Sequence, residues 1–138
     1  MAETPLSPQD ALVMVMLSVS FADENVRTAE LLTIQNLVEN LPVFADYDPE
    51  RLQEMGRMMT GLMEQEDGLD TLFDRVRRFL PERLRETGYA LACDVAAADG
   101  RISEPEGEML AEIRGELGLD RLHAAAIERG ARARWMRV

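Results

Sequence analysis

Two acidic segments carry residue types and spacing that could bind a cation. We call residues 23–30 the first acidic turn and residues 99–106 the second acidic turn; each begins with Asp and ends with Glu seven positions later. Carboxylate oxygens are hard ligands that suit Ca²⁺, Mg²⁺ and Mn²⁺. Four carboxylates brought together would repel each other without a cation. The candidate metal ligands are Asp23, Glu30, Asp99 and Glu106.

The sequence around the two turns recurs at a shift of 76 residues. Val26 falls on Ile102, and Ile34 falls on Leu110. Each half reads as an apolar helix, an acidic turn whose aliphatic residue plugs into the core, and an amphipathic helix. We therefore predict two halves, at about 8–41 and 82–117, that pack about a pseudo-two-fold axis. The bare Asp-to-Glu spacing is weak evidence, because 26 of the 138 residues are acidic.

The second acidic turn permits two interpretations. Ser103 and Glu106 match a capping box, in which each side chain satisfies a backbone amide at a helix start. Asp99, Gly100 and Ile102 instead match the second half of an EF-hand loop, with Gly100 at the sharp turn and Ile102 in the core. The positions of the first two EF-hand ligands are apolar, so neither turn is a complete EF-hand; they are Val95 and Ala97 in the second half and Val19 and Phe21 in the first.

The elements that position these turns are expected to be helices, because strand-like alternation is missing. Ser7 and Pro8 are typical of a helix start. The apolar stretches at residues 11–17 and 89–98 predict two central, enclosed helices. The sequence predicts an all-α fold of about seven helices: 8–22, a second ending at Pro42, a third capped by Asp48, 69–79, 82–98, a sixth ending at Gly118, and 120–134.

Length and composition fit a single domain over residues 1–138, with the two middle helices inside residues 49–80. The longest apolar run, residues 11–17, is far shorter than a membrane span, and the N-terminus lacks the basic start of a secretory signal. We therefore expect a cytoplasmic protein. Cys93 lies in an apolar stretch and is expected to be a core residue. His123 is the only imidazole and is expected to be solvated, which makes a zinc site improbable.

The net charge of −11 argues against nucleic-acid binding. The charge is uneven, with +4 on residues 121–138 and −15 on the rest. This basic tail could contact anionic lipid or nucleic acid, or it could pair with the acidic body of the protein, which we favour. A Met-rich face on the third helix is expected to be core packing, with a docking groove as the alternative.

The stretch from Ala97 to Ile102 with Glu106 resembles the TerB-like family of tellurite-resistance proteins and the N-terminal domain of DjlA-type co-chaperones. The resemblance covers nearly the whole chain. It implies an all-α domain of about seven helices with internal symmetry, an acidic surface that binds divalent metal, and work alongside membrane-associated stress complexes. Asp99 and Glu106 carry the family pattern, whereas Glu24 and Asn25 depart from it.

The residues provide no catalytic triad, phosphate-binding Gly loop or dinucleotide motif, so we do not expect an enzyme. The leading hypothesis is a non-catalytic binding module that uses its acidic face, with a divalent cation (Ca, Mg or Mn), to engage a protein partner, which could be membrane-associated, in a metal or envelope stress response such as tellurite resistance. The alternative is a metal-independent interaction or scaffold domain whose acidic turns are helix caps. The sequence does not indicate the oligomeric state.

Overall fold

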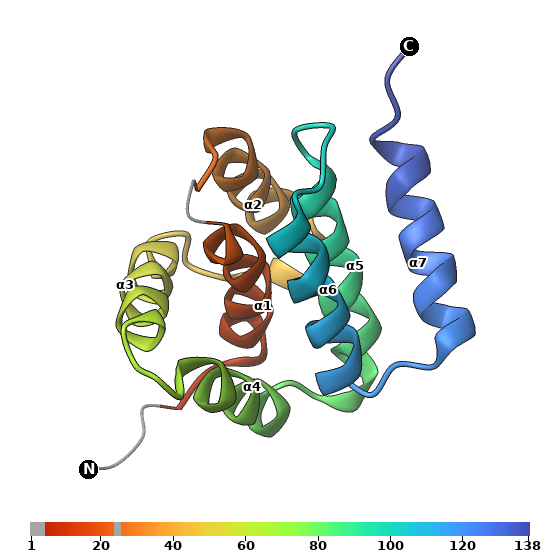
Figure 1. Ribbon diagram of the computed structural model, residues 1–138. Helices are drawn as coiled ribbons and strands as arrows, with labels where there is room; N and C mark the ends of the chain where they lie inside the picture. The colour runs from red at the N-terminus through yellow and green to blue at the C-terminus, as the bar shows by residue number, and fades with distance from the viewer. Residues whose placement is uncertain (1–4, 24–25) are drawn as a thin grey trace.

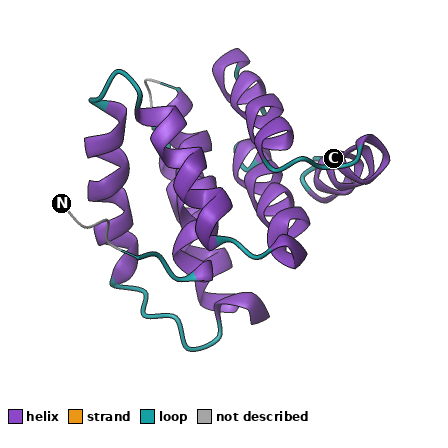
Figure 2. Ribbon diagram, turned by 90° about the horizontal axis from the view of Figure 1, so that it is seen from below, coloured by secondary structure: helices purple, strands orange, loops and turns teal. Residues whose placement is uncertain are grey.

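The fold consists of helices joined by short connections (Figure 1, Figure 2). The computed structural model describes residues 5–23 and 26–138, and these ranges hold seven α-helices, two 3-10 helices and no strand. The prediction of an all-α fold with about seven helices is confirmed. The α-helices are α1 (Pro8–Ala22), α2 (Thr28–Asn40), α3 (Arg51–Met63), α4 (Gly68–Phe79), α5 (Arg85–Ala97), α6 (Glu104–Glu116) and α7 (Arg121–Arg134); the 3-10 helices are Pro42–Phe44 and Glu82–Leu84.

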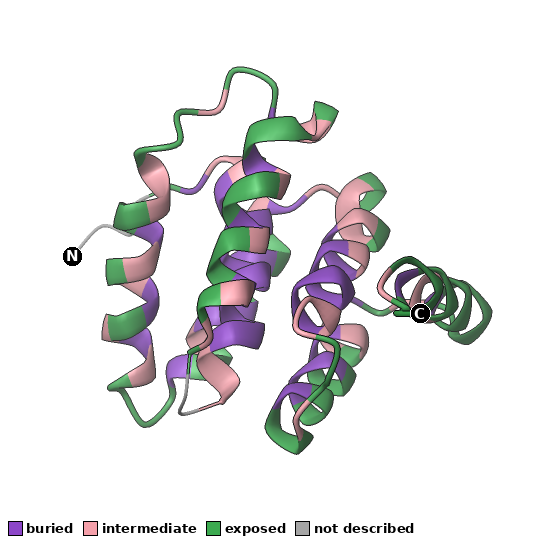
Figure 3. Ribbon diagram, turned by 90° about the horizontal axis from the view of Figure 1, so that it is seen from above, coloured by how far each residue is buried: buried purple, intermediate pink, exposed green. Residues whose placement is uncertain are grey.

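Helix α1 is the centre of the fold, as its apolar sequence predicts. The Ser7 hydroxyl accepts a hydrogen bond from the Asp10 amide, and the Asp10 carboxylate accepts one from the Ser7 amide, so a capping box fixes the helix start. All residues from 11 to 17 are buried (Figure 3). A helix that is apolar on every side must be enclosed, and α1 packs against α2, α3, α4, α5 and α6.

Helix α5 is the second central helix. It contacts α1, α2, α6 and α7, and nearly all of its residues from 88 to 96 are buried. The apolar stretch at residues 89–98 therefore predicted its place correctly. The outer helices are α3 on one side of the α1–α5 pair and α7 on the other, with α4 across one end (Figure 1).

The Met-rich face of α3 is core packing, as expected. Met55 and Met59 are fully buried, and α3 packs on α1 and α4. Met is unbranched and adapts its shape to irregular gaps between helices, which suits this position. The groove beside α3, of about 610 Å³, is lined by other residues of this helix and by none of its methionines.

Helices α2 and α6 occupy equivalent positions in the sequence. The shift of 76 residues carries the start Thr28 onto Glu104 and the end Asn40 onto Glu116. The helices before them, α1 and α5, end at Ala22 and Ala97, one residue away from the same register. The predicted pseudo-two-fold axis between the halves remains a prediction.

Three local predictions differ from the structure. Asp48 does not cap α3, which begins at Arg51; its side chain accepts a hydrogen bond from the Glu50 amide at 3.0 Å and closes a turn before the helix. The fifth helix begins at Arg85, because Glu82–Leu84 forms a separate 3-10 turn after Pro81. The spacing of Leu31, Ile34 and Val38 predicts that all three lie on the inner face of the second helix, but Leu31 is 44% exposed.

Within the ranges 5–23 and 26–138, none of the helices combines the length and apolar character required to cross a bilayer.

Candidate functional site

The fold brings the two acidic turns together around one guanidinium. The Nη1 of Arg27 contacts the Asp99 carboxylate, and its Nη2 lies 3.4 Å from Asp23 Oδ2. The same Nη1 lies 3.4 Å from the carbonyl oxygen of Arg101. Arg27 thus joins the first acidic turn to Asp99 of the second, 72 residues further along the sequence. We call Arg27 with Asp23, Glu30, Asp99 and Glu106 the acidic centre.

The two glutamates of the acidic centre are completely buried. Glu30 and Glu106 each occupy the third position of their helices, α2 and α6, and each is 0% exposed. A side chain at this position points back toward the helix start, which places both carboxyl groups under the turns. A buried carboxylate is costly unless its oxygens find donors or a countercharge.

The two carboxyl groups are satisfied to different degrees. Ser103 forms the predicted capping box: its amide donates to Glu106 Oε1 at 3.0 Å, and its hydroxyl accepts from the Glu106 amide at 3.3 Å. At the equivalent start of α2, Arg27 makes no side-chain cap. In the described part of the chain, both oxygens of Glu30 and Oε2 of Glu106 therefore lack a hydrogen bond of normal geometry.

Glu30 also titrates abnormally. Burial, then the contact with Glu106 and the negative charges of Glu106 and Asp99, raises the pKa of Glu30 to about 8. The Arg27 guanidinium opposes this rise. No well-oriented hydrogen bond joins Glu30 to Glu106, but the negative charge nearby helps to keep a proton on Glu30 at neutral pH.

The donor chemistry of the acidic centre suits a hard cation, but the present arrangement does not hold one. Three buried carboxylate oxygens without partners are the kind of atom that a divalent ion would bind. Among residues 5–23 and 26–138, however, no three acidic, imidazole or thiol groups surround a common point at metal-binding distance. Arg27 contributes the positive charge between Asp23 and Asp99 instead.

The second acidic turn resembles an EF-hand loop in its backbone at Gly100, but its aliphatic residue, Ile102, is not in the core as an EF-hand requires. Gly100 has a φ of 83°, which a side chain would strain, and Asp99 Oδ1 accepts from the Arg101 amide at 3.1 Å. Val26 and Ile102 were expected to plug into the core, but they are 41% and 49% exposed. Each instead lines a groove at the molecular surface. The family departures at Glu24 and Asn25 lie outside the described residues.

Cys93 and His123 take no part in the acidic centre. Cys93 is buried in α5, and burial raises the pKa of its thiol to about 12, so it is an unreactive core residue as predicted. The His123 side chain is 60% exposed on α7. Its Nδ1 lies 3.8 Å from Asp120 Oδ2 and 4.0 Å from Glu86 Oε2.

Sequence reasoning missed three charged residues. Arg27 lies four residues after Asp23, a spacing that could have indicated a local ion pair. Asp10 has the acidic residue type that is common in a first helical turn, but it is 1% exposed and accepts hydrogen bonds from the Arg51 guanidinium and the Tyr47 hydroxyl. Asp94 receives Arg134 and Trp135, so the basic tail pairs with the body of the protein at this point.

The comparisons with known proteins identify a family. The family model described as tellurite resistance protein TerB matches residues 9–129, which is most of the chain and includes both acidic turns. No match was found among curated proteins or among solved structures. Since the family match spans α1 to α6 and most of α7, the chain belongs to the TerB family of tellurite resistance proteins.

Proposed function

We propose that this TerB domain is a non-catalytic binding module whose acidic centre takes up a divalent cation in place of Arg27. The observation that supports this proposal is a set of three buried carboxylate oxygens, on Glu30 and Glu106, that have no hydrogen-bond partner among the described residues. They lie beside an arginine that bridges Asp23 and Asp99. A Ca²⁺, Mg²⁺ or Mn²⁺ ion would supply the positive charge that these oxygens lack.

The residues of the centre have separable tasks in this proposal. Asp23 and Asp99, on the flanking turns, are held by a guanidinium that is one-third exposed and can swing into solvent. Glu30 must lose its proton before its oxygens can serve as ligands, so uptake is expected to strengthen as pH rises. Ser103 holds Glu106 in place throughout.

A change at Arg27 would alter the link between the two halves of the molecule. Arg27 begins α2 and contacts the turn that begins α6. Its release would change the exposed charge of both turns at once. We propose that a protein partner recognises this acidic face, and that the domain works in a metal or envelope stress response such as tellurite resistance.

The alternative function is a metal-independent interaction or scaffold domain. The completed capping box at Ser103 favours it, because the second acidic turn then needs no ion to explain its Glu. In this alternative, Arg27 is the permanent countercharge of the turns.

Thermal melting of the metal-free protein with Ca²⁺, Mg²⁺ or Mn²⁺ distinguishes the two functions. An ion at 100 times its Kd should add about 2.7 kcal/mol to the free energy of unfolding. We expect Asp99→Asn to reduce this response and Arg27→Gln to increase it, because the competing guanidinium is removed. Asp120→Asn is the matched control, since Asp120 caps α7 away from the centre.

An absence of any ion response in both the wild type and Arg27→Gln would contradict cation binding and favour the scaffold alternative. An equal response in Asp99→Asn and Asp120→Asn would show that ions bind elsewhere on the acidic surface. In cells that depend on the protein for tellurite tolerance, Asp99→Asn should fail to restore growth while Asp120→Asn succeeds; restoration by both would contradict the proposed stress role of the centre.

A further inference from the structure

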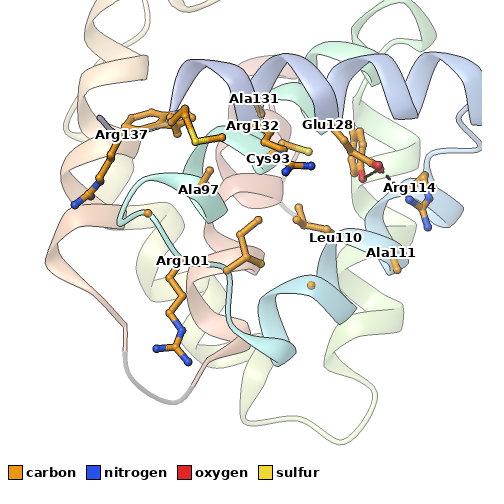
Figure 4. A pocket seen from close by; sticks show the side chains of 16 residues that line it. Cys93, Ala97, Arg101, Leu110, Ala111, Arg114, Glu128, Ala131, Arg132 and Arg137 are labelled. Carbon is orange, nitrogen blue, oxygen red and sulfur yellow. Dashed lines mark hydrogen bonds and ion pairs between the residues drawn. The ribbon is translucent and has the colours of Figure 1, made fainter.

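A groove between α5, α6 and α7 has no place in the function proposed above. We call it the α7 groove; its volume is about 690 Å³, within the range of small-molecule sites (Figure 4). Its floor comes from α5, the second acidic turn and α6. The floor residues are Cys93, Ala97, Ile102, Gly107, Leu110 and Ala111.

The rim of the α7 groove is rich in positively charged residues, although the protein as a whole is acidic. Four arginines line the groove, whereas the chain as a whole has a net charge of −11. The one acidic residue of the lining, Glu128, is engaged: its Oε2 accepts from Arg114 Nη1 at 2.8 Å and from the Tyr89 hydroxyl at 2.5 Å. In the described structure, the guanidinium groups of the other three, Arg101, Arg132 and Arg137, have no carboxylate partner.

The wall of the groove is anchored, so the groove exists before any ligand binds. Asp94 of α5 is 7% exposed and accepts from Arg134 Nε at 3.1 Å and from Trp135 Nε1 at 3.0 Å. These contacts fix the last turn of α7 against α5. At that end, the Arg137 guanidinium lies against Gly100, where a side chain on Gly100 would come within 3.0 Å of it.

The two ends of the groove therefore differ. In Figure 4, the Arg114–Glu128 pair lies at one end, and Arg101 and Arg137 lie toward the other. An apolar floor between a neutralised end and a cationic end suits a molecule with an apolar body and an anionic head. A fully polar anion would leave the floor residues unused, and a cation would be repelled by the free arginines.

We propose that the α7 groove binds a single-chain amphipathic anion, an acyl chain that ends in a carboxylate. The chain lies along Leu110 and Ile102, where it removes apolar surface from water. The carboxylate lies toward the end of the groove that Arg101 and Arg137 line, and Arg132 adds positive charge from the α7 wall in the middle of the groove. Guanidinium groups can donate charge-assisted hydrogen bonds to a carboxylate.

The chain contains its own reporter for this test. Trp135 is the only tryptophan and lines the groove. Titration with dodecanoate below its micelle concentration should shift Trp135 emission to shorter wavelength and saturate at one ligand per protein. Arg132→Gln combined with Arg137→Gln should weaken binding by about tenfold, because two partly exposed ionic contacts are lost.

Matched ligands and variants make the result decisive. Acetate tests the head group alone, and dodecyltrimethylammonium tests the chain with the opposite charge; neither should bind comparably. Arg57→Gln, which removes an arginine from the groove beside α3, should leave dodecanoate affinity unchanged. Equal binding of the cationic amphiphile, equal affinity in the double variant, or a response only to phosphatidylglycerol vesicles would overturn the proposal.

Discussion

The groove beside α3 and the groove beside α7 have floors built from the same relative positions. The groove beside α3, of about 610 Å³, we call the α3 groove. A shift of 76 residues carries each of its six floor residues onto a floor residue of the α7 groove. Those of the α3 groove are Leu17, Phe21, Val26, Leu31, Ile34 and Gln35; those of the α7 groove are Cys93, Ala97, Ile102, Gly107, Leu110 and Ala111.

The walls of the two grooves differ, and so does their chemistry. Helix α3 contributes a single charged residue, Arg57, to its groove. The rim of the α7 groove carries three arginines for which residues 5–23 and 26–138 provide no carboxylate partner. The floor of the α3 groove also has larger residues, such as Leu31 where the α7 groove has Gly107. The comparison teaches that similar helix–turn–helix floors acquire different binding chemistry through the helix packed beside them.

Each wall helix is held by one buried aspartate, but the two anchors are unequal. Asp10 uses both carboxylate oxygens, accepting from Arg51 Nε at 3.0 Å, from Arg51 Nη2 at 2.6 Å and from the Tyr47 hydroxyl at 2.6 Å. Asp94 receives Arg134 and Trp135 on Oδ1 alone. The contacts of Asp10 therefore hold α3 more strongly than those of Asp94 hold α7. They hold α3 by its first residue, Arg51.

The largest expected effect is the loss of the Asp10 anchor. Asp10→Ala leaves a bidentate arginine and a tyrosine hydroxyl without their acceptor and also breaks the α1 capping box, so urea unfolding should show a loss of about 3–5 kcal/mol. Asp94→Ala should cost about 1.5–3 kcal/mol. Asp74→Ala, which removes an exposed pair with Arg78, should change stability by less than about 1 kcal/mol. Equal losses for Asp10→Ala and Asp94→Ala would remove the distinction between the anchors.

The next largest effect is the dependence of stability on pH, which should differ in sign between the buried carboxyl groups of Asp10 and Glu30. Burial raises the pKa of Asp10, but the hydrogen bonds from Arg51, Tyr47 and Ser7 outweigh it, so the net pKa is lowered. The stabilisation that Asp10 gives is present above its unfolded pKa and is lost as pH falls through the folded value. Glu30 is the opposite case, because its pKa in the folded protein is raised to about 8 and the fold favours its protonated form. Its contribution to stability is therefore fully present below the unfolded pKa and is lost as pH rises toward the folded value.

Unfolding of wild type and Glu30→Gln in chelator-containing buffer tests this contrast. Between pH 5.5 and 8 the free energy of unfolding of the wild type should fall by about 1–3 kcal/mol relative to that of Glu30→Gln. A difference of one bound proton between the folded and unfolded states changes this free energy by at most about 1.4 kcal/mol per pH unit. Glu39→Gln, an exposed change on the same helix, should track the wild type. A constant difference between wild type and Glu30→Gln across this range would mean that Glu30 is ionised in the fold.

Local rules predicted the helices because their signals lie within one turn of the chain. Ser7 caps α1 beside Pro8, Ser103 completes the capping box with Glu106, and the apolar stretches mark α1 and α5 as central. These features depend on contacts between residues three or four apart, which the sequence displays directly.

The acidic centre and the grooves depend on contacts between distant residues. The link from Arg27 to Asp99 spans 72 positions, and nothing local indicates that a guanidinium stands between the turns. Val26 and Ile102 have the residue type of a core plug, but α3 and α7 pack beside them without closing over them, so both remain exposed on the floors of the two grooves. Their exposure is decided by the neighbouring helix and not by the turn.

The substitution with the smallest expected effect on stability is Gly107→Leu, which tests whether a floor residue of the α7 groove decides what this groove can bind. Gly107→Leu places in the α7 groove the residue found at the equivalent position of the α3 groove. A Cβ at Gly107 meets no atom within 4 Å. Replacing an exposed glycine inside α6 should therefore stabilise the protein by up to about 1 kcal/mol. The leucine would occupy the floor, so dodecanoate affinity should fall.

Gly115→Leu is the matched control for this change. Gly115 lies in the same helix, also has open space at its Cβ and is absent from the lining of the groove. It should give a similar gain in urea unfolding and leave the Trp135 titration unchanged. If both leucines weaken dodecanoate binding equally, the anion binds to the surface of α6 at large. If only Gly107→Leu weakens it, the glycine at position 107 is what admits an acyl chain to the α7 groove, and Leu31 at the equivalent position is what excludes one from the α3 groove.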